Sequence, residues 1–169
     1  MTGSTPPYRA EHIGSLLRPQ NLIDARDAFD AGKLSREELT ETENAAIADV
    51  VKYQEGLGLK VVTDGEYRRI SYFVDFVNGL DGVEATARGQ SGWDYNSADG
   101  SGTKVQATRI DITGKIGWPE GGILLNDFAY LKSVAADGST LKMTMPAPNQ
   151  IYWFGGPDSV DRTVYPDMD

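Results

Sequence analysis

The chain has 169 residues, of which 40% are hydrophobic and 24% charged, and its 16 basic and 25 acidic residues give a formal net charge of −9. This length and composition are typical of a globular domain and exclude a disordered chain. The lysines and arginines gather in no basic patch, so we expect no nucleic-acid partner. Cysteine is absent and His12 is the only histidine, so this chain by itself cannot supply a zinc site of the usual nitrogen and sulfur type.

The apolar segments of the sequence are all short. No run of about 18 apolar residues occurs, and the N-terminal residues contain no apolar stretch of the signal-peptide kind. We therefore expect a soluble, cytoplasmic protein with no membrane partner.

The first elements in chain order are an arm, a strand and a helix. Residues 1–7 are rich in proline, serine and threonine and predict a loose arm, and residues 8–15 predict a short strand that runs into a Gly-Ser turn. A helix is expected to begin near Pro19, where a missing N–H is tolerated, and to end at Gly32.

The next helix has the clearest start signal. Ser35 and Glu38 form a capping box, in which the serine oxygen accepts a backbone N–H of the first helical turn and the Glu38 side chain reaches back to the N-cap. Apolar residues behind it line one face, so we predict a helix over residues 36–56. Residues 59–63 form a short apolar run bounded by glycines, which is typical of a strand buried on both faces.

The second half of the chain is less regular. Residues 70–83 are apolar and aromatic and predict a helix, and residues 84–102 are rich in glycine, serine, aspartate and asparagine and predict a long surface excursion. Residues 104–118 alternate as one or two antiparallel strands do. An amphipathic helix is predicted over 124–135 and a buried strand over 141–148. The residues after them are typical of turns and predict no further helix or strand. Buried strands that alternate with helices predict a parallel α/β arrangement.

Two carboxylates stand directly after the predicted strand 59–63. Ligands of parallel α/β proteins bind at the carboxyl ends of strands. The spacing of two places Asp64 and Glu66 on the same side if the extended geometry continues. A carboxylate there can accept a proton, bind a metal or receive a substrate ammonium. The alternative is structural: Asp64 caps the following helix, and Glu66 pairs with Arg68 or Arg69 at the surface.

A second polar segment follows the predicted strand 8–15. The turn at Gly14 and Ser15 presents backbone N–H groups and a hydroxyl, which suit a carboxylate or a phosphate, although a plain helix cap uses the same residues. His12 is either a site residue or a packed, hydrogen-bonded one. Arg18 pairs either with a ligand anion or with a surface carboxylate.

Three segments taken together resemble the cobalamin-independent methionine synthase family, and its short single-barrel members in particular. They are "HIGSLLRP" at residues 12–19, "KVVTDGEYRR" followed by "YFVDFVNGL" at 60–80, and "MPAP" at 145–148. The resemblance covers most of the chain but only the N-terminal half of a (β/α)8 barrel. It implies an α/β fold, a partial TIM barrel formed by residues 1–169 as a single domain, with residues 84–138 as an inserted hairpin and helix.

The resemblance also implies an activity, the transfer of a methyl group to the thiol of homocysteine in methionine biosynthesis. An enzyme of this kind is a 5-methyltetrahydropteroyltriglutamate–homocysteine methyltransferase. In the family, an Ile-Gly-Ser turn holds the amino acid's carboxylate and a Gly-Glu pair after the second strand receives its ammonium. The full-length synthases often have another polar residue where this chain has Asp64. The candidate substrate-binding residues are Ile13, Gly14, Ser15, Glu66, Asp64 and His12.

The resemblance implies zinc as a cofactor, which activates the thiol in the family. The family's zinc ligands come from the C-terminal half of the barrel, so we expect no metal ligand in this chain. An open half-barrel favours a complementary half-barrel chain or a second copy as partner. The expected small molecules are a homocysteine-like thiol and a methyl donor, which residues 146–153 are expected to face. Two alternatives stay open: an alkyl transferase or lyase acting on another thiol, and a non-catalytic fragment that needs a partner chain.

Overall fold

The structure is a computed structural model that describes residues 12–96 and 102–167, with only the backbone for residues 86–107. The predicted arm at 1–7 and the beginning of the predicted strand 8–15 lie outside the described residues. The chain divides into two compact units. The described part of unit 1 is residues 12–69 and 124–144, and that of unit 2 is residues 70–96, 102–123 and 145–167.

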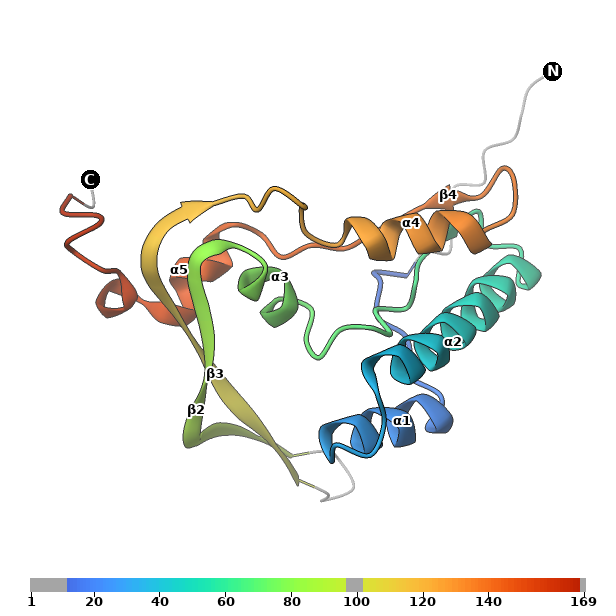
Figure 1. Cartoon of the computed structure of the whole chain (residues 1–169), viewed down its shortest axis with the longest axis horizontal. Coiled ribbons are helices and arrows are strands. Elements are labelled where there is room, and N and C mark those ends of the chain that lie inside the picture. The colour runs from blue at the N-terminus through green and yellow to red at the C-terminus, as the bar shows by residue number, and fades with distance from the viewer. Residues whose placement is uncertain (1–11, 97–101, 168–169) are drawn as a thin grey trace. The chain divides into compact units, whose positions relative to one another are not determined.

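Unit 1 contains helices and a short parallel strand pair (Figure 1). Its elements are α1 (Gln20–Asp30), α2 (Arg36–Gly56), β1 (Val61–Val62), α4 (Leu125–Val134) and β4 (Thr140–Leu141). The predicted helix 36–56 is confirmed with both ends, because Ser35 Oγ accepts the Glu38 N–H at 3.2 Å and Glu38 Oε2 accepts the Ser35 N–H at 2.8 Å. The helices predicted from Pro19 and over 124–135 are also confirmed.

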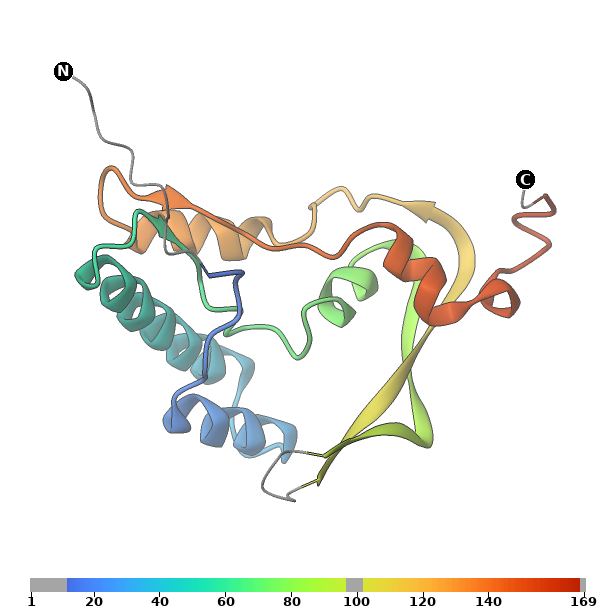
Figure 2. The ribbon, with the colours of Figure 1, turned by 180° about the vertical axis from the view of Figure 1, so that it is seen from behind.

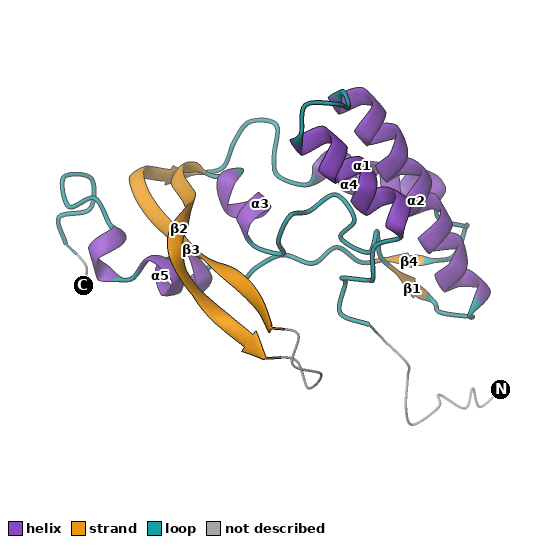
Figure 3. Ribbon diagram, turned by 90° about the horizontal axis from the view of Figure 1, so that it is seen from below, coloured by secondary structure: helices purple, strands orange, loops and turns teal. Residues whose placement is uncertain are grey.

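The core of unit 1 lies between the apolar face of α2 and its neighbours α1, α4 and β1. Figure 3 shows these helices on one side of the β1–β4 pair. Burying such side chains contributes about 1.5–3 kcal/mol each. The buried apolar side chains are Leu22, Leu39, Ala46, Ile47, Val50, Val51, Val62, Tyr67 and Leu131.

The two strands of unit 1 are parallel, as expected, but shorter than predicted. Val61 pairs with Thr140 and Val62 with Leu141, so most of the predicted strand 141–148 is not a strand. Residues 12–15 form no strand either, and the prediction for 8–15 is wrong over its described part. Among the described residues, one main-chain hydrogen bond joins the loop at residues 12–19 to the turn after β1, from the Leu16 N–H to Gly65 O, and no ladder forms there.

Unit 2 is built on a long antiparallel hairpin (Figure 2). The described elements are α3 (Val74–Asn78), β2 (Asp81–Asn96), β3 (Gly102–Gly117), α5 (Asn149–Gly155) and a 3-10 helix (Pro157–Ser159). The strand predicted within 104–118 is confirmed, but the irregular excursion predicted over 84–102 is wrong in residues 84–96. Pairing with β3 overrides the glycine-rich composition, and two register shifts, after Asp81 and after Arg88, absorb the residues that do not fit the ladder.

The core of unit 2 is small and aromatic. Phe73, Val77, Val83 and Ile110 are buried, and the ring of Phe154 on α5 stacks on that of Phe73 at 4.3 Å between centroids. The helix predicted over 70–83 is limited to α3, because the chain enters β2 at Asp81. Helix α5 was not predicted from the sequence. The α/β class is confirmed, and within the described ranges no helix is long and apolar enough to cross a membrane.

Candidate functional site

A sharp turn follows β1 and carries the two predicted carboxylates. The backbone of Gly65 (φ 70°) and of Glu66 (φ 58°) is left-handed, a conformation that costs a non-glycine residue about 1–2 kcal/mol. The Glu66 N–H donates to Asp64 Oδ1 at 2.9 Å. The extended geometry considered for these residues therefore ends at Gly65. Asp64 caps this turn and not a helix, because the next described helix, α3, begins only at Val74.

The loop at residues 12–19 packs directly on this turn. Each contact uses a carbonyl oxygen of one segment and a donor of the other, so the hydrogen bonds hold the two segments together. The hydrogen bonds are Thr63 Oγ1 to Gly14 O (2.9 Å), Leu16 N to Gly65 O (3.0 Å), Tyr67 Oη to Leu17 O (2.8 Å), Arg18 Nη2 to Glu66 O (2.9 Å) and Arg18 Nη2 to Arg69 O (2.6 Å). Arg18 is thus bound to the backbone of the turn, and no carboxylate within the described ranges pairs with it.

The two predicted segments meet at the carboxylate of Glu66, which is 5% exposed. A Cβ atom on Gly14 would lie 2.8 Å from Glu66 Oε1 and 2.7 Å from the Thr144 methyl, closer than real Cβ atoms approach. Thr144 Oγ1 donates to Glu66 Oε1 at 2.5 Å, and Arg69 Nη1 lies 3.9 Å from the same oxygen. The structure therefore brings Gly14 and Glu66 together and adds Thr144, which lies just after β4.

The remaining predicted residues surround this contact. Ile13 is 85% exposed and Ser15 is also exposed, whereas Asp64 is buried. Asp64 Oδ2 has no hydrogen-bond partner among the described residues. His12 Nε2 contacts Gln54 Oε1, so His12 is a packed, hydrogen-bonded residue that holds the start of the loop.

The buried Gln54 of α2 replaces a strand neighbour. Its side-chain amide donates to Thr63 O at 2.9 Å and accepts the Thr63 N–H at 3.0 Å, as a paired strand would. The same Oε1 atom accepts from His12, and the amide also donates to Val50 O. Gln54 thereby connects α2, the end of β1 and the loop at residues 12–19.

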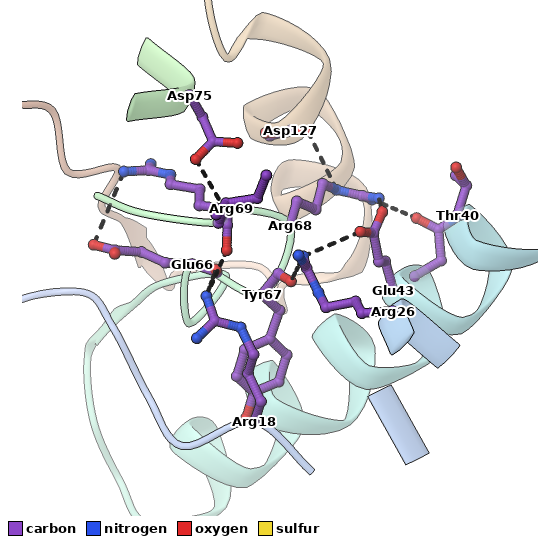
Figure 4. Close-up of polar contacts among 12 residues, drawn as sticks. Arg18, Arg26, Thr40, Glu43, Glu66, Tyr67, Arg68, Arg69, Asp75 and Asp127 are labelled. Atoms are coloured by element: carbon purple, nitrogen blue, oxygen red, sulfur yellow. Dashed lines mark hydrogen bonds and ion pairs between the residues drawn. The ribbon is translucent and has the colours of Figure 1, made fainter. Parts of the chain in front are cut away.

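A charged cluster, which we call the Glu43 cluster, supports the other side of the turn (Figure 4). Glu43 is fully buried and lies 3.2 Å from Arg26, 2.8 Å from Arg36 and 3.1 Å from Arg68. Arg68 also lies 3.2 Å from Asp127. Burial raises the pKa of the Asp127 carboxyl, and the nearby Arg68 guanidinium opposes that rise in part.

Sequence reasoning missed Glu43 and Thr144. Glu43 had a signal, since it is an acid on the α2 face that Leu39, Ile47 and Val50 make apolar. An acidic side chain on an apolar helix face is either buried with charged partners or turned out toward the solvent. Here Glu43 is buried and three arginines surround it. Thr144 had a weaker signal, a hydroxyl between two methionines in the segment predicted as a strand.

The described residues do not fit a zinc site. Within ranges 12–96 and 102–167, no group of three or more histidine, cysteine, aspartate or glutamate side chains could hold a metal ion. The one histidine of the chain is engaged with Gln54. We therefore derive no step through zinc from this chain.

Comparisons with known proteins place the chain in a family. Residues 9–97 match the family model described as "Cobalamin-independent synthase, Catalytic domain". The uncharacterized protein YxjH of Bacillus subtilis (strain 168) is 37% identical over 163 residues, which are 96% of this chain and 40% of YxjH. The methionine synthase of Sulfolobus acidocaldarius is 31% identical over 139 residues, 82% of this chain and 38% of that protein.

A solved structure agrees with these relatives. A protein from Listeria monocytogenes, described as a vitamin-B12-independent methionine synthase, superposes with a TM-score of 0.70 at 33% identity. The match covers 92% of this chain and 40% of that protein, so the chain spans about two fifths of the length of the relatives it matches. On the match over residues 9–97 and these likenesses, the chain belongs to the cobalamin-independent methionine synthase family.

Proposed function

We propose that this chain forms the N-terminal half of a (β/α)8 barrel and binds the amino-acid substrate of a methyltransferase that methylates the thiol of homocysteine or a similar thiol. The observation that carries the proposal is the contact of Gly14 with Glu66 at the ends of two segments that pack on each other. The likeness to proteins described as methionine synthases over 82% and 92% of the chain supports the same assignment.

The two segments offer opposite charges to the two ends of an amino acid. The N–H groups of Gly14 and Ser15 have no hydrogen-bond partner among the described residues, so they are free to bind a substrate carboxylate. Glu66 Oε2 likewise has no partner in the described part of the chain and is available to an ammonium. A hydrogen bond between charged groups contributes about 1.5–3 kcal/mol. These residues bind and orient the substrate, and they carry out no chemistry.

The methyl-transfer step depends on groups beyond this chain. The zinc that the family resemblance implies would need ligands from another part of the barrel, and the methyl donor would be met by residues 146–153. A complementary chain or a longer form of the protein would provide the missing half. The chain's own contribution is the selection of a thiol that carries both an ammonium and a carboxylate.

Calorimetric titration of reduced L-homocysteine into the chain and into Glu66→Gln tests the proposal. Glutamine keeps the shape of the side chain and removes its charge, so we expect the affinity to fall by about tenfold to a hundredfold. Glu41→Gln on the exposed face of α2 is the matched control and should bind as the unmodified chain does.

Equal affinity in Glu66→Gln and the unmodified chain would contradict the amino-acid assignment. The same titration with 4-mercaptobutanoate, which is homocysteine without its ammonium, separates the alternatives. A chain that binds this thiol as tightly as homocysteine acts on another class of thiol. A chain that binds neither thiol would instead support the non-catalytic alternative.

A further inference from the structure

We propose that Thr144 is a positioning residue that holds the Glu66 carboxylate so that its second oxygen meets the substrate ammonium. This inference rests on the proposed function and goes beyond it, because it assigns the geometry of the ammonium site to a residue outside the family motifs described above. Three observations carry it: the direction of the hydrogen bonds at Thr144, the free oxygen of Glu66, and the close packing of Gly14.

The direction of the hydrogen bonds follows from the chemistry of the side chains. Arg69 Nη1 lies 3.3 Å from Thr144 Oγ1, and a guanidinium can only donate, so the threonine oxygen accepts there. The single O–H of Thr144 then donates to Glu66 Oε1, at 2.5 Å. The Thr144 hydroxyl, placed between a guanidinium and a carboxylate, thus has a single hydrogen-bonding orientation. This orientation holds Glu66 Oε1 in place.

Thr144 also keeps Arg69 away from Glu66. The Arg69 side chain is 3% exposed, and its Nη2 lies 2.8 Å from Met143 Sδ, so it is held in the interior. Its distance of 3.9 Å from Glu66 Oε1 is too long for a hydrogen bond. Without the hydroxyl between them, the guanidinium could approach Glu66 directly and compete with a substrate ammonium for the same charge.

The position of Thr144 in the fold explains why it can do this. β1 and β4 are paired in parallel, and Glu66 and Thr144 follow these strands by four and three residues, so both lie at the carboxyl ends of the strands. Gly14 fills the third side, with no room for a side chain beside Thr144 and Glu66 Oε1. Oε2 is the carboxylate oxygen that has no partner among the described residues.

The test compares two ligands on three forms of the chain. L-Methionine carries the ammonium and 4-(methylthio)butanoate lacks it, and neither needs a zinc-bound thiolate. Calorimetry with the unmodified chain, Thr144→Val and Thr144→Ser gives the ratio of the two affinities in each form. We expect Thr144→Val to lower the preference for L-methionine by about tenfold while the affinity for 4-(methylthio)butanoate stays the same. Thr144→Ser, which keeps the hydroxyl, should restore the preference.

If Thr144 had only a structural role, Thr144→Val would lower the affinity for both ligands by the same factor. That result would overturn the proposal. It would also be overturned if Thr144→Val kept the full preference while Glu66→Gln lost it, an outcome that leaves the proposed function intact. An unmodified chain with no preference for L-methionine would refute the proposed function and this inference with it. If Thr144→Val does not fold by circular dichroism, Thr144→Ala removes the same hydroxyl without a second methyl group.

Discussion

Glu43 and its three arginines offer the most direct test of how unit 1 is held together. In Glu43→Gln the side chain keeps its shape, while the guanidinium groups of Arg26, Arg36 and Arg68 lose their common anion. Removing one partner of a buried ion pair leaves an uncompensated charge and typically costs about 3–5 kcal/mol. The cluster contacts the turn after β1 through Arg68, so its loss should destabilise that turn.

The expected loss of stability in Glu43→Gln lies at the lower end of this range. The Arg36 side chain is 55% exposed and can turn into water, whereas those of Arg26 and Arg68 are only 19% and 11% exposed. Arg26 keeps the backbone carbonyl of Tyr67 as a partner. Arg68 retains Asp127 as a partner at 3.2 Å. We therefore expect Glu43→Gln to lower the free energy of unfolding by about 3 kcal/mol. The free energy of unfolding of a small domain is about 5–15 kcal/mol in total, so this loss is a large share of it.

Urea denaturation followed by far-UV circular dichroism is the suitable assay. Urea is uncharged and does not screen ion pairs as a salt does. Circular dichroism reports the long helix α2, whereas the three tryptophans, Trp93, Trp118 and Trp153, all belong to unit 2. The exposed Glu41→Gln is the control and should change the stability by less than about 0.5 kcal/mol. If the midpoint of Glu43→Gln equals that of Glu41→Gln, the buried cluster does not stabilise the unit and the reasoning is refuted.

Two further predictions concern Gly14 and Asp127. Gly14→Ala places a methyl group against Thr144 and Glu66, so we expect a loss of about 1–3 kcal/mol of stability and weaker L-methionine binding, measured by urea denaturation and calorimetry. Normal binding would show that the loop moves away at no cost. Burial raises the pKa of Asp127 above its ordinary 3.8, so the unfolded carboxyl ionises first as the pH rises. The stability of the unmodified chain relative to Asp127→Asn should therefore fall as the pH rises from 3.8 through the raised pKa. Urea midpoints of both proteins across this range test the sign, and a constant difference would contradict it.

Local signals in the sequence were sufficient for the helices of unit 1. The capping box at Ser35 and Glu38 fixes the start of α2 through contacts within one turn, and the glycines after it mark the end. Such signals act over a few residues and need no knowledge of the rest of the chain. The segments around Gly14 and Glu66 were likewise identified from their residue types, together with a family resemblance that the match over residues 9–97 confirms.

The strands depended on partners far along the chain. The glycine-rich composition of residues 84–96 predicted an excursion, but pairing with β3 makes them part of β2. The predicted strand at 8–15 lacks such a partner in its described part and stays a loop. A strand is stabilised by its neighbour's hydrogen bonds, and composition alone carries little information about which neighbour is present.

The sequence by itself determined the family, the three helices of unit 1 and the two segments that carry Gly14 and Glu66. The tertiary structure decided how these segments are used: it turned the backbone at Glu66, buried Glu43 among arginines and placed Thr144 on the Glu66 carboxylate. The physical reason is distance along the chain. A helix cap is complete within four residues, whereas the contact of Gly14, Glu66 and Thr144 joins residues up to 130 positions apart and accompanies the parallel pairing of β1 with β4.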